Sequence, residues 1–433
     1  MKKELFASII LMLFLLFIVG CSEVTVENKN IDSASEVQDN NGLMENINSN
    51  PNSPVLDNQN NLDNQNNLDN QNNLENEQSN LIIDNNNNNC EEGKIILSYT
   101  PVNLDKTLYF LPMGGTSGEH VAPIDHGYFQ NFNNKEANIE VYSPGKGIIT
   151  DMQHMGSFVG DDKSRAPMDD YRLVIEHTCG ISTIFIHIDK LSDRIKKVAP
   201  EFGKYNRVNL PVEAGEIIGW YKDNVDFNVV DKDFSIEWIN PESYKSDQNR
   251  AHIKDPFDYF TEPLQLQLIA KSLRTASPRG GTIDYDITGT LQGTWFVEGT
   301  NGWGGLKQER YWADHLSIIP DNVDPEHIVF SIGTYQGVAK QFGIKDNLPH
   351  PADVNKDSGL IKLELMDARL FDGDQEWDYR NFVQGLKMKN KGNILGVVLI
   401  EMVDYNKIKV EVFPDKTGSQ VSEFTNNFQI YVR

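Results

Sequence analysis

The sequence contains only three cysteines among 433 residues, carries no basic stripe, and has no aromatic side chain between residues 22 and 89. Its formal net charge is −24 at pH 7. A nucleic-acid-binding surface needs clustered lysine and arginine to neutralise phosphates. The composition therefore excludes nucleic acid as a partner.

Long apolar runs are also scarce, and the main one, Leu5–Val19, is shorter than the roughly 20 residues that a membrane-spanning helix needs. Two lysines precede this run and Gly20-Cys21 follows it, a pattern typical of a secretory signal peptide. Its end resembles a bacterial-type lipobox, which implies removal of residues 1–20 and a lipid anchor on Cys21, outside the cytoplasm. An uncleaved signal anchor and a soluble secreted protein with a free cysteine are the alternatives.

Residues 21–89 are predicted to be a disordered tether. They repeat Leu-Asp-Asn-Gln-Asn-Asn from Leu56, Leu62 and Leu68, and they bury too little apolar surface to fold. Three polar copies are too few to stack as a β-helix. Twelve acidic residues and one lysine place −11 of the net charge in residues 22–89. Anionic lipid head groups would repel this segment and keep it extended.

The two cysteines other than Cys21 are Cys90, at the end of the tether, and Cys179, inside the globular part. In an oxidising compartment they can form a disulfide. Such a bond would stabilise the start of the folded part by restricting the unfolded chain. Two unpaired thiols remain the alternative, because sequence gives no Cα separation.

From Gly93 onward the composition is that of a globular protein, and the length suggests two domains, predicted at 90–262 and 263–433. Short apolar runs separated by Gly, Pro and Asp predict a β-rich first domain. A helix is predicted to begin at Thr261-Glu262-Pro263 and to run toward Leu273, at the boundary. The strands predicted before this helix are 95–99, 139–142, 147–152, 171–176, 182–188 and 216–221.

The second domain alternates apolar and polar residues in long runs, most clearly at 408–413, which is predicted to pair with 394–403 across a tight turn. This pattern predicts an antiparallel β-barrel or sandwich and makes the whole protein mainly β. Further strands are predicted at 283–287, 293–297, 328–332, 360–365 and 428–432.

Three motifs follow one another in the first domain: the hairpin sequence 143–149, the strand pair 173–188, and the Gly-x-x-Ile-Gly turn within 212–219. Together they resemble the lysostaphin-like (LytM-type) zinc endopeptidases, over roughly His120 to Val230. The resemblance implies a duplicated hybrid motif fold and hydrolysis of peptides in peptidoglycan.

The metal site that the resemblance implies is altered in this sequence. The family takes ligands from an HxxxD motif and from the second histidine of a late HxH motif. Here His120 and Asp125 are five positions apart in place of four, Asn224 and Asp226 stand for the two late histidines, and His187 stands where a histidine assists catalysis. The implied set is therefore His120, Asp125 and Asp226 as metal ligands, with His187 and Asn224 at catalytic positions.

Zinc is the default metal for this set, because three protein ligands and an open water position generate the attacking hydroxide. Two carboxylates shift the preference toward Mn²⁺, Mg²⁺ or Ca²⁺. Two functions stay open: a metal-dependent endopeptidase in which His187 steers the water, and a degenerate module that binds wall polymer or a partner protein. In a third reading, His120 and His126 are loop residues and Asp125 caps a turn.

The remaining motifs give weaker predictions. His177 is predicted to be structural, and His252 to pack beside the site or to order a turn. The Gly-x-Trp at Trp295 is similar to that of lipocalins and predicts a core aromatic, with a small apolar ligand in the barrel mouth as the alternative. Solvated loops are predicted for His154, His315, His327 and His350.

Overall fold

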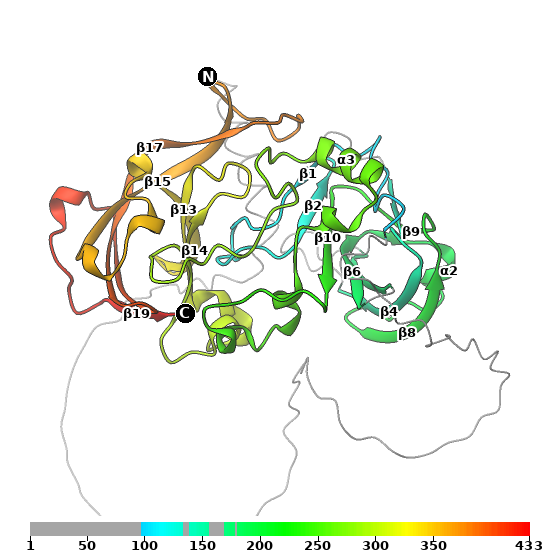
Figure 1. The fold of residues 1–433 in the computed structure, drawn as a ribbon, viewed down its shortest axis with the longest axis horizontal. Coiled ribbons are helices and arrows are strands. Elements are labelled where there is room, and N and C mark those ends of the chain that lie inside the picture. Colours follow the sequence, from blue (N-terminus) through cyan, green and yellow to red (C-terminus); the bar gives the residue numbers. More distant parts are fainter. Residues whose placement is uncertain (1–96, 133–137, 156–168, 178–179) are drawn as a thin grey trace, which may run out of the picture. The chain divides into compact units, whose positions relative to one another are not determined.

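The computed structural model describes residues 97–132, 138–155, 169–177 and 180–433 (Figure 1). The predictions on Cys21, on the tether and on a Cys90–Cys179 disulfide lie outside the described residues. Within the described part, no helix is both long and apolar enough to span a membrane.

The first half of the described chain forms two antiparallel sheets, one of seven strands in the order β1-β2-β10-β6-β5-β4-β8 and one of three in the order β3-β9-β7. The large sheet consists of β1 (Tyr109–Leu111), β2 (Gly127–Gln130), β4 (Gly147–His154), β5 (Tyr171–Glu176), β6 (Ile181–Ile188), β8 (Tyr205–Val212) and β10 (Asn224–Asp231). The small sheet consists of β3 (Ile139–Tyr142), β7 (Lys190–Leu191) and β9 (Ile217–Tyr221).

One face of the large sheet is apolar and forms the core of this half. In β5, for example, the alternate residues Tyr171, Leu173 and Ile175 are buried, and they pack in one cluster with residues of the small sheet and of the helix that follows. Each fully buried large apolar side chain contributes about 1.5–3 kcal/mol. On the opposite face, polar residues of β10 lie beside apolar residues that pack in a second cluster: Val174, Ile184, Ile186 and Val230.

The predicted helix is confirmed as α3 (Glu262–Lys271), with Thr261 at its N-cap, Pro263 in its first turn and Leu268 buried. Proline fits there because the first turn needs no donor from that residue. The other α-helix is the single turn α2 (Asp193–Lys196). Short 3₁₀ turns are η1 (Pro241–Tyr244), η2 (Gln248–His252), η3 (Pro256–Tyr259), η4 (Gly302–Gly304), η5 (Gln308–Asp314), η6 (Lys345–Asn347), η7 (Pro351–Asp353), η8 (Lys356–Ser358) and η9 (Gly418–Gln420).

The second half closes into an eight-stranded antiparallel β-barrel in the order β14-β13-β12-β11-β19-β18-β17-β15, with β15 paired back to β14 (Figure 1). The prediction of a mainly β protein is thus confirmed, and of the two alternatives for this half the barrel is present. Trp295 is fully buried in it. The strands are β11 (Gly293–Val297), β12 (His315–Pro320), β13 (Ile328–Tyr335), β14 (Val338–Ile344), β15 (Ile361–Asp372), β17 (Lys387–Asp404), β18 (Lys407–Pro414) and β19 (Gln429–Val432), with β16 (Gln375–Glu376) paired to β15 outside the ring.

The prediction of a strand at Ile283–Ile287 was wrong. Its carbonyls are satisfied by side chains in place of a neighbouring strand: Gln292 donates to the Tyr285 carbonyl at 2.9 Å and Arg433 to the Ile287 carbonyl at 2.9 Å. Of the predicted strand at 95–99, the described residues form only an isolated bridge between Leu97 and Phe260.

Three of the histidines predicted in solvated loops are buried. His315 lies in β12 and bonds the Trp303 carbonyl at 3.1 Å, His154 stacks on Tyr171 in the sheet, and His327 is also buried. The sequence pattern did not indicate their burial, because the contacts that bury each ring form only when distant segments of the chain pack together. His177 is structural, with ring nitrogens bonded to backbone and to Thr183.

Candidate functional site

The polar face of the large sheet is centred on β10. Strand register places Asp226 beside Tyr128 of β2 on one side and beside Ile186 of β6 on the other, while Asn228 lies two residues further along the same face. The Asp226 carboxylate is almost fully buried, with 4% of its side chain exposed. We call this surface, with Tyr128, His187, Asp226 and Asn228, the polar face.

His187 reaches the polar face through a β-bulge. Between the pairs Tyr171↔Ile188 and Leu173↔Phe185, β6 has one residue more than β5, and His187 has a positive φ of 68°. A bulge leaves one residue unpaired and redirects its side chain. The His187 ring therefore stands at the surface, 46% exposed, instead of entering the core.

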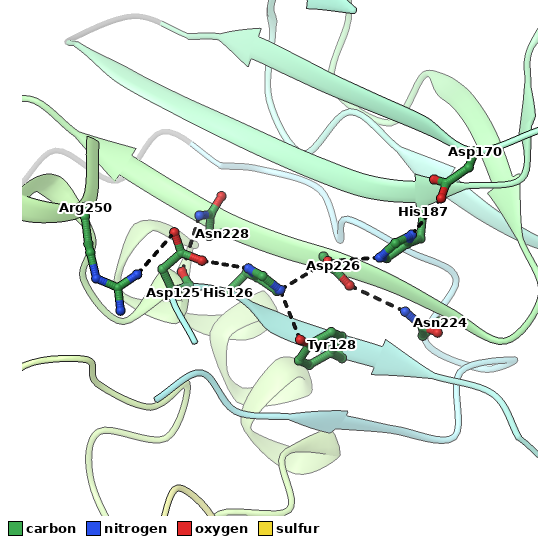
Figure 2. A network of polar contacts seen from close by, with 9 residues as sticks. All are labelled: Asp125, His126, Tyr128, Asp170, His187, Asn224, Asp226, Asn228 and Arg250. Carbon is green, nitrogen blue, oxygen red and sulfur yellow. Dashed lines mark hydrogen bonds and ion pairs between the residues drawn. The ribbon is translucent and has the colours of Figure 1, made fainter. Parts of the chain in front are cut away.

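Two carboxylates flank the ring of His187. Its Nδ1 lies 3.1 Å from Oδ2 of Asp170, which comes just before β5, and its Nε2 lies 3.5 Å from Oδ2 of Asp226. Asn224 donates to the other Asp226 oxygen at 3.4 Å. Figure 2 shows these side chains converging from β6, β10 and the start of β5.

His126 continues this chain of contacts on the other side of Asp226. Its Nδ1 lies 2.7 Å from Oδ1 of Asp125, and its Nε2 lies 3.1 Å from Oδ2 of Asp226 and 3.1 Å from the Tyr128 hydroxyl. The ring thus stands between the two carboxylates, each bound to a different nitrogen (Figure 2). With both nitrogens facing carboxylates, the ring is held as a double donor.

Arg250, on η2, is the last residue of this series of contacts on its buried side. Its Nη1 lies 3.8 Å from Oδ2 of Asp125, it donates to the Pro123 carbonyl, and its guanidinium lies 3.8 Å from the Trp303 ring centroid. Asn228 donates to the Asp125 carbonyl at 3.3 Å. Because Arg250 is only 2% exposed, these contacts fix the loop that carries Asp125 and His126.

Basic and acidic groups alternate along this series of contacts. Burial raises the pKa of Asp226, although the His126 and His187 charges oppose the increase. Burial alone would lower the pKa of His187, but the Asp226 and Asp170 carboxylates raise it to about 9. The pKa of His126 is also raised, because Asp226 and Asp125 outweigh burial. Burial acts against ionised Asp125, yet the His126 hydrogen bond and the Arg250 charge hold its pKa below its usual range.

His120 is not part of this series of polar contacts. Burial lowers its pKa to about 4, and its ring lies edge-on to His126 at 6.3 Å between centroids. Its loop is held by Gln341 of β14, which accepts from the Gly118 amide at 3.1 Å and donates to the Gly118 carbonyl at 2.9 Å. The barrel thus contacts the loop that carries the predicted first ligand.

Comparison with known proteins gives limited help. No family model matches the sequence, and no curated protein does. A solved structure of lysostaphin, determined by NMR in solution, is similar over 56% of this chain and 90% of that chain, with 12% sequence identity and a TM-score of 0.21. A score this low carries no argument, so the family resemblance rests on the three sequence motifs.

The residues that are present do not fit a metal ion in the predicted way. Asp125 and Asp226 cannot share an ion because the His126 ring occupies the space between them, and both of its nitrogens are engaged. Across the described part of the chain, no group of three or more His, Cys, Asp or Glu side chains is arranged to hold a metal. Asp226 does contact His187 and Asn224. Among the described residues, no hydrogen bond or ion pair joins His120 to Asp226.

Four participants were missed from sequence: His126 as a bridging group, Tyr128, Asp170 and Arg250. The sequence shows that Asp125 and His126 are adjacent, but it does not indicate that the His126 ring turns toward β10. Asp170 precedes a confirmed strand, and its contact with His187 depends on the bulge. Arg250 approaches from more than a hundred residues away, a distance in sequence that no motif spans.

Proposed function

We propose that this chain is a lipid-anchored cell-envelope protein whose N-terminal β half binds a wall polymer on the polar face and does not hydrolyse it. The lipobox-like Cys21 supports the anchor, and the acidic segment 21–89 supports a reach from the membrane toward the wall. The sequence motifs support wall polymer as the ligand, and the site geometry supports binding without metal chemistry.

The observation that carries the proposal is the position of His126 between Asp125 and Asp226. A metal-ligating imidazole must offer an unprotonated nitrogen. Here each nitrogen faces a carboxylate, and the carboxylates expected to bind the ion neutralise the ring instead. The chain of ion pairs thus replaces the cation that the related sequence motifs would require.

The protonation of His187 also favours a binding role over that of a general base. A general base must be unprotonated at the working pH, whereas a pKa of about 9 leaves this ring charged at neutral pH. A half-exposed imidazolium can instead donate hydrogen bonds to carbonyl or carboxylate oxygens of a bound polymer. His187 is therefore assigned to binding.

The test uses the detergent-solubilised full chain and insoluble peptidoglycan sacculi, with added Zn²⁺ or Mn²⁺. We expect the protein to sediment with the sacculi while no soluble peptide is released. His187→Gln should weaken sedimentation, and His350→Gln, on a barrel loop, serves as the matched control. Metal-dependent release of peptides, or no sedimentation of the wild-type protein, would overturn the proposal.

A further inference from the structure

Arg172 lies on the polar face in the strand next to His187. In β5 the residues on either side, Tyr171 and Leu173, are buried in the core, so Arg172 projects from the opposite face and is half-buried there. It stands at the bulge, between the pairs Tyr171↔Ile188 and Leu173↔Phe185. Strand register therefore places it opposite Ile186 and His187.

The guanidinium of Arg172 has no hydrogen bond or ion pair with any residue that the structure describes. The carboxylates whose charge acts on it include Asp151 and Asp125. Asp151 already accepts from Thr150 at 2.7 Å and from the Tyr205 hydroxyl. Asp125 is engaged by His126 and Arg250. Asp151 and Asp125 are thus committed to other donors, and Asp247 acts on Arg172 through its charge, with no hydrogen bond or ion pair between the two among the described residues.

Other shielded arginines of this protein donate hydrogen bonds to backbone carbonyls. Arg250 donates to the Pro123 carbonyl, Arg274 to the Asn322 carbonyl, and Arg433 to three backbone carbonyls. A partly buried charged group without a partner is costly, and folded proteins rarely retain one without a role. Arg172 departs from this pattern at a position on the candidate site.

We propose that Arg172 binds a carboxylate of a peptide ligand that lies across the polar face toward His187. The planar guanidinium fork matches a carboxylate with two parallel hydrogen bonds. A monoanion is favoured over a phosphate because the charges of Asp151 and Asp247 already act on Arg172 and would repel a second negative charge. The inference rests on the proposed function and names the group of the wall polymer that is recognised.

The test compares sedimentation of the full chain with untreated sacculi and with sacculi whose carboxyl groups have been amidated by carbodiimide and ammonium. We expect the wild-type protein to bind amidated sacculi about 10- to 100-fold more weakly, the range for loss of one charge-assisted contact. Arg172→Gln should bind untreated sacculi with the same loss and should be insensitive to amidation. Arg172→Lys should fall between the two.

Arg207→Gln is the matched control, because Arg207 is an exposed arginine on β8 of the same sheet. Equal binding of untreated and amidated sacculi by the wild-type protein would overturn the inference and leave the proposed function standing. Failure of the wild-type protein to bind either preparation would instead overturn the proposed function. Stronger competition by inorganic phosphate than by acetate would overturn the assignment to a carboxylate.

Discussion

His315 in the barrel and His187 on the polar face show two opposite ways of accommodating an imidazole. Burial lowers the pKa of His315 to about 4, and one backbone carbonyl satisfies its Nε2. His187 has carboxylates on both sides, which raise its pKa to about 9. The barrel therefore keeps a neutral ring and the polar face keeps a charged one. The His315 ring therefore has a structural role in the barrel, whereas the His187 ring on the polar face is available to a ligand.

The largest expected effect comes from removing the carboxylate that His126 and His187 share. Asp226→Ala would leave the His126 and His187 rings with one carboxylate each, and loss of this buried charge partner should lower the free energy of unfolding by about 3–5 kcal/mol. Urea denaturation at pH 7 measures the change, with the exposed Asp357→Ala as control. Unchanged stability would mean that the polar face does not depend on alternating charges.

The next effect concerns the contact that ties Arg250 to η4 of the barrel half. Trp303→Leu removes the aromatic ring under the guanidinium and should destabilise the protein by about 1–2 kcal/mol, in the range of a shielded cation–π contact. The same urea titration measures it. A double-mutant cycle with Arg250→Met should show coupling of the two changes, and independent, additive effects would contradict a direct contact.

The two histidines should give opposite pH dependences of stability. The folded pKa of His187 lies above its ordinary value, so its contribution is complete below about pH 6.5 and is lost as pH rises through about 9. We expect the stability of the wild-type protein to fall from pH 7 to pH 9.5 by more than that of His187→Gln. Parallel curves for the two proteins would contradict the charged ring.

For His315 the direction reverses, since its folded pKa lies below the ordinary value. Its neutral form contributes above about pH 6.5, and that contribution is lost as pH falls toward about 4. NMR titration should show no protonation of this ring above pH 5.5, while the His187 signal should titrate near pH 9. The same titration midpoint for both rings would contradict the opposite pKa shifts of His187 and His315.

The smallest effect is expected on the surface of the barrel. Lys391 and Glu376 form an exposed ion pair, with 54% and 39% of their side chains exposed. Lys391→Gln should change stability by less than about 1 kcal/mol, because water already solvates both groups. A larger loss of stability would show that the contact of β16 with β17 depends on charge pairing as strongly as the polar face does.

Local patterns predicted the local parts of this fold. The alternation in β5 and β18 and the capping sequence at Thr261 are properties of a few adjacent residues, and each is confirmed. The resemblance of the strand motifs also pointed to His187 and Asp226, and the structure brings their side chains within 3.5 Å of each other. The site as a whole was not, since His126 and Arg250 act through contacts that only the folded chain creates.

The register of the barrel strands also determines where the ring is weakest. Two of its junctions, β14 with β15 and β11 with β19, contain only two paired positions each, whereas β18 pairs with β17 from Lys407 to Pro414, along its whole length. These two short junctions divide the ring into two four-stranded halves. Backbone opening requires the fewest broken hydrogen bonds there, so amide protons at both junctions should exchange with solvent before those between β17 and β18.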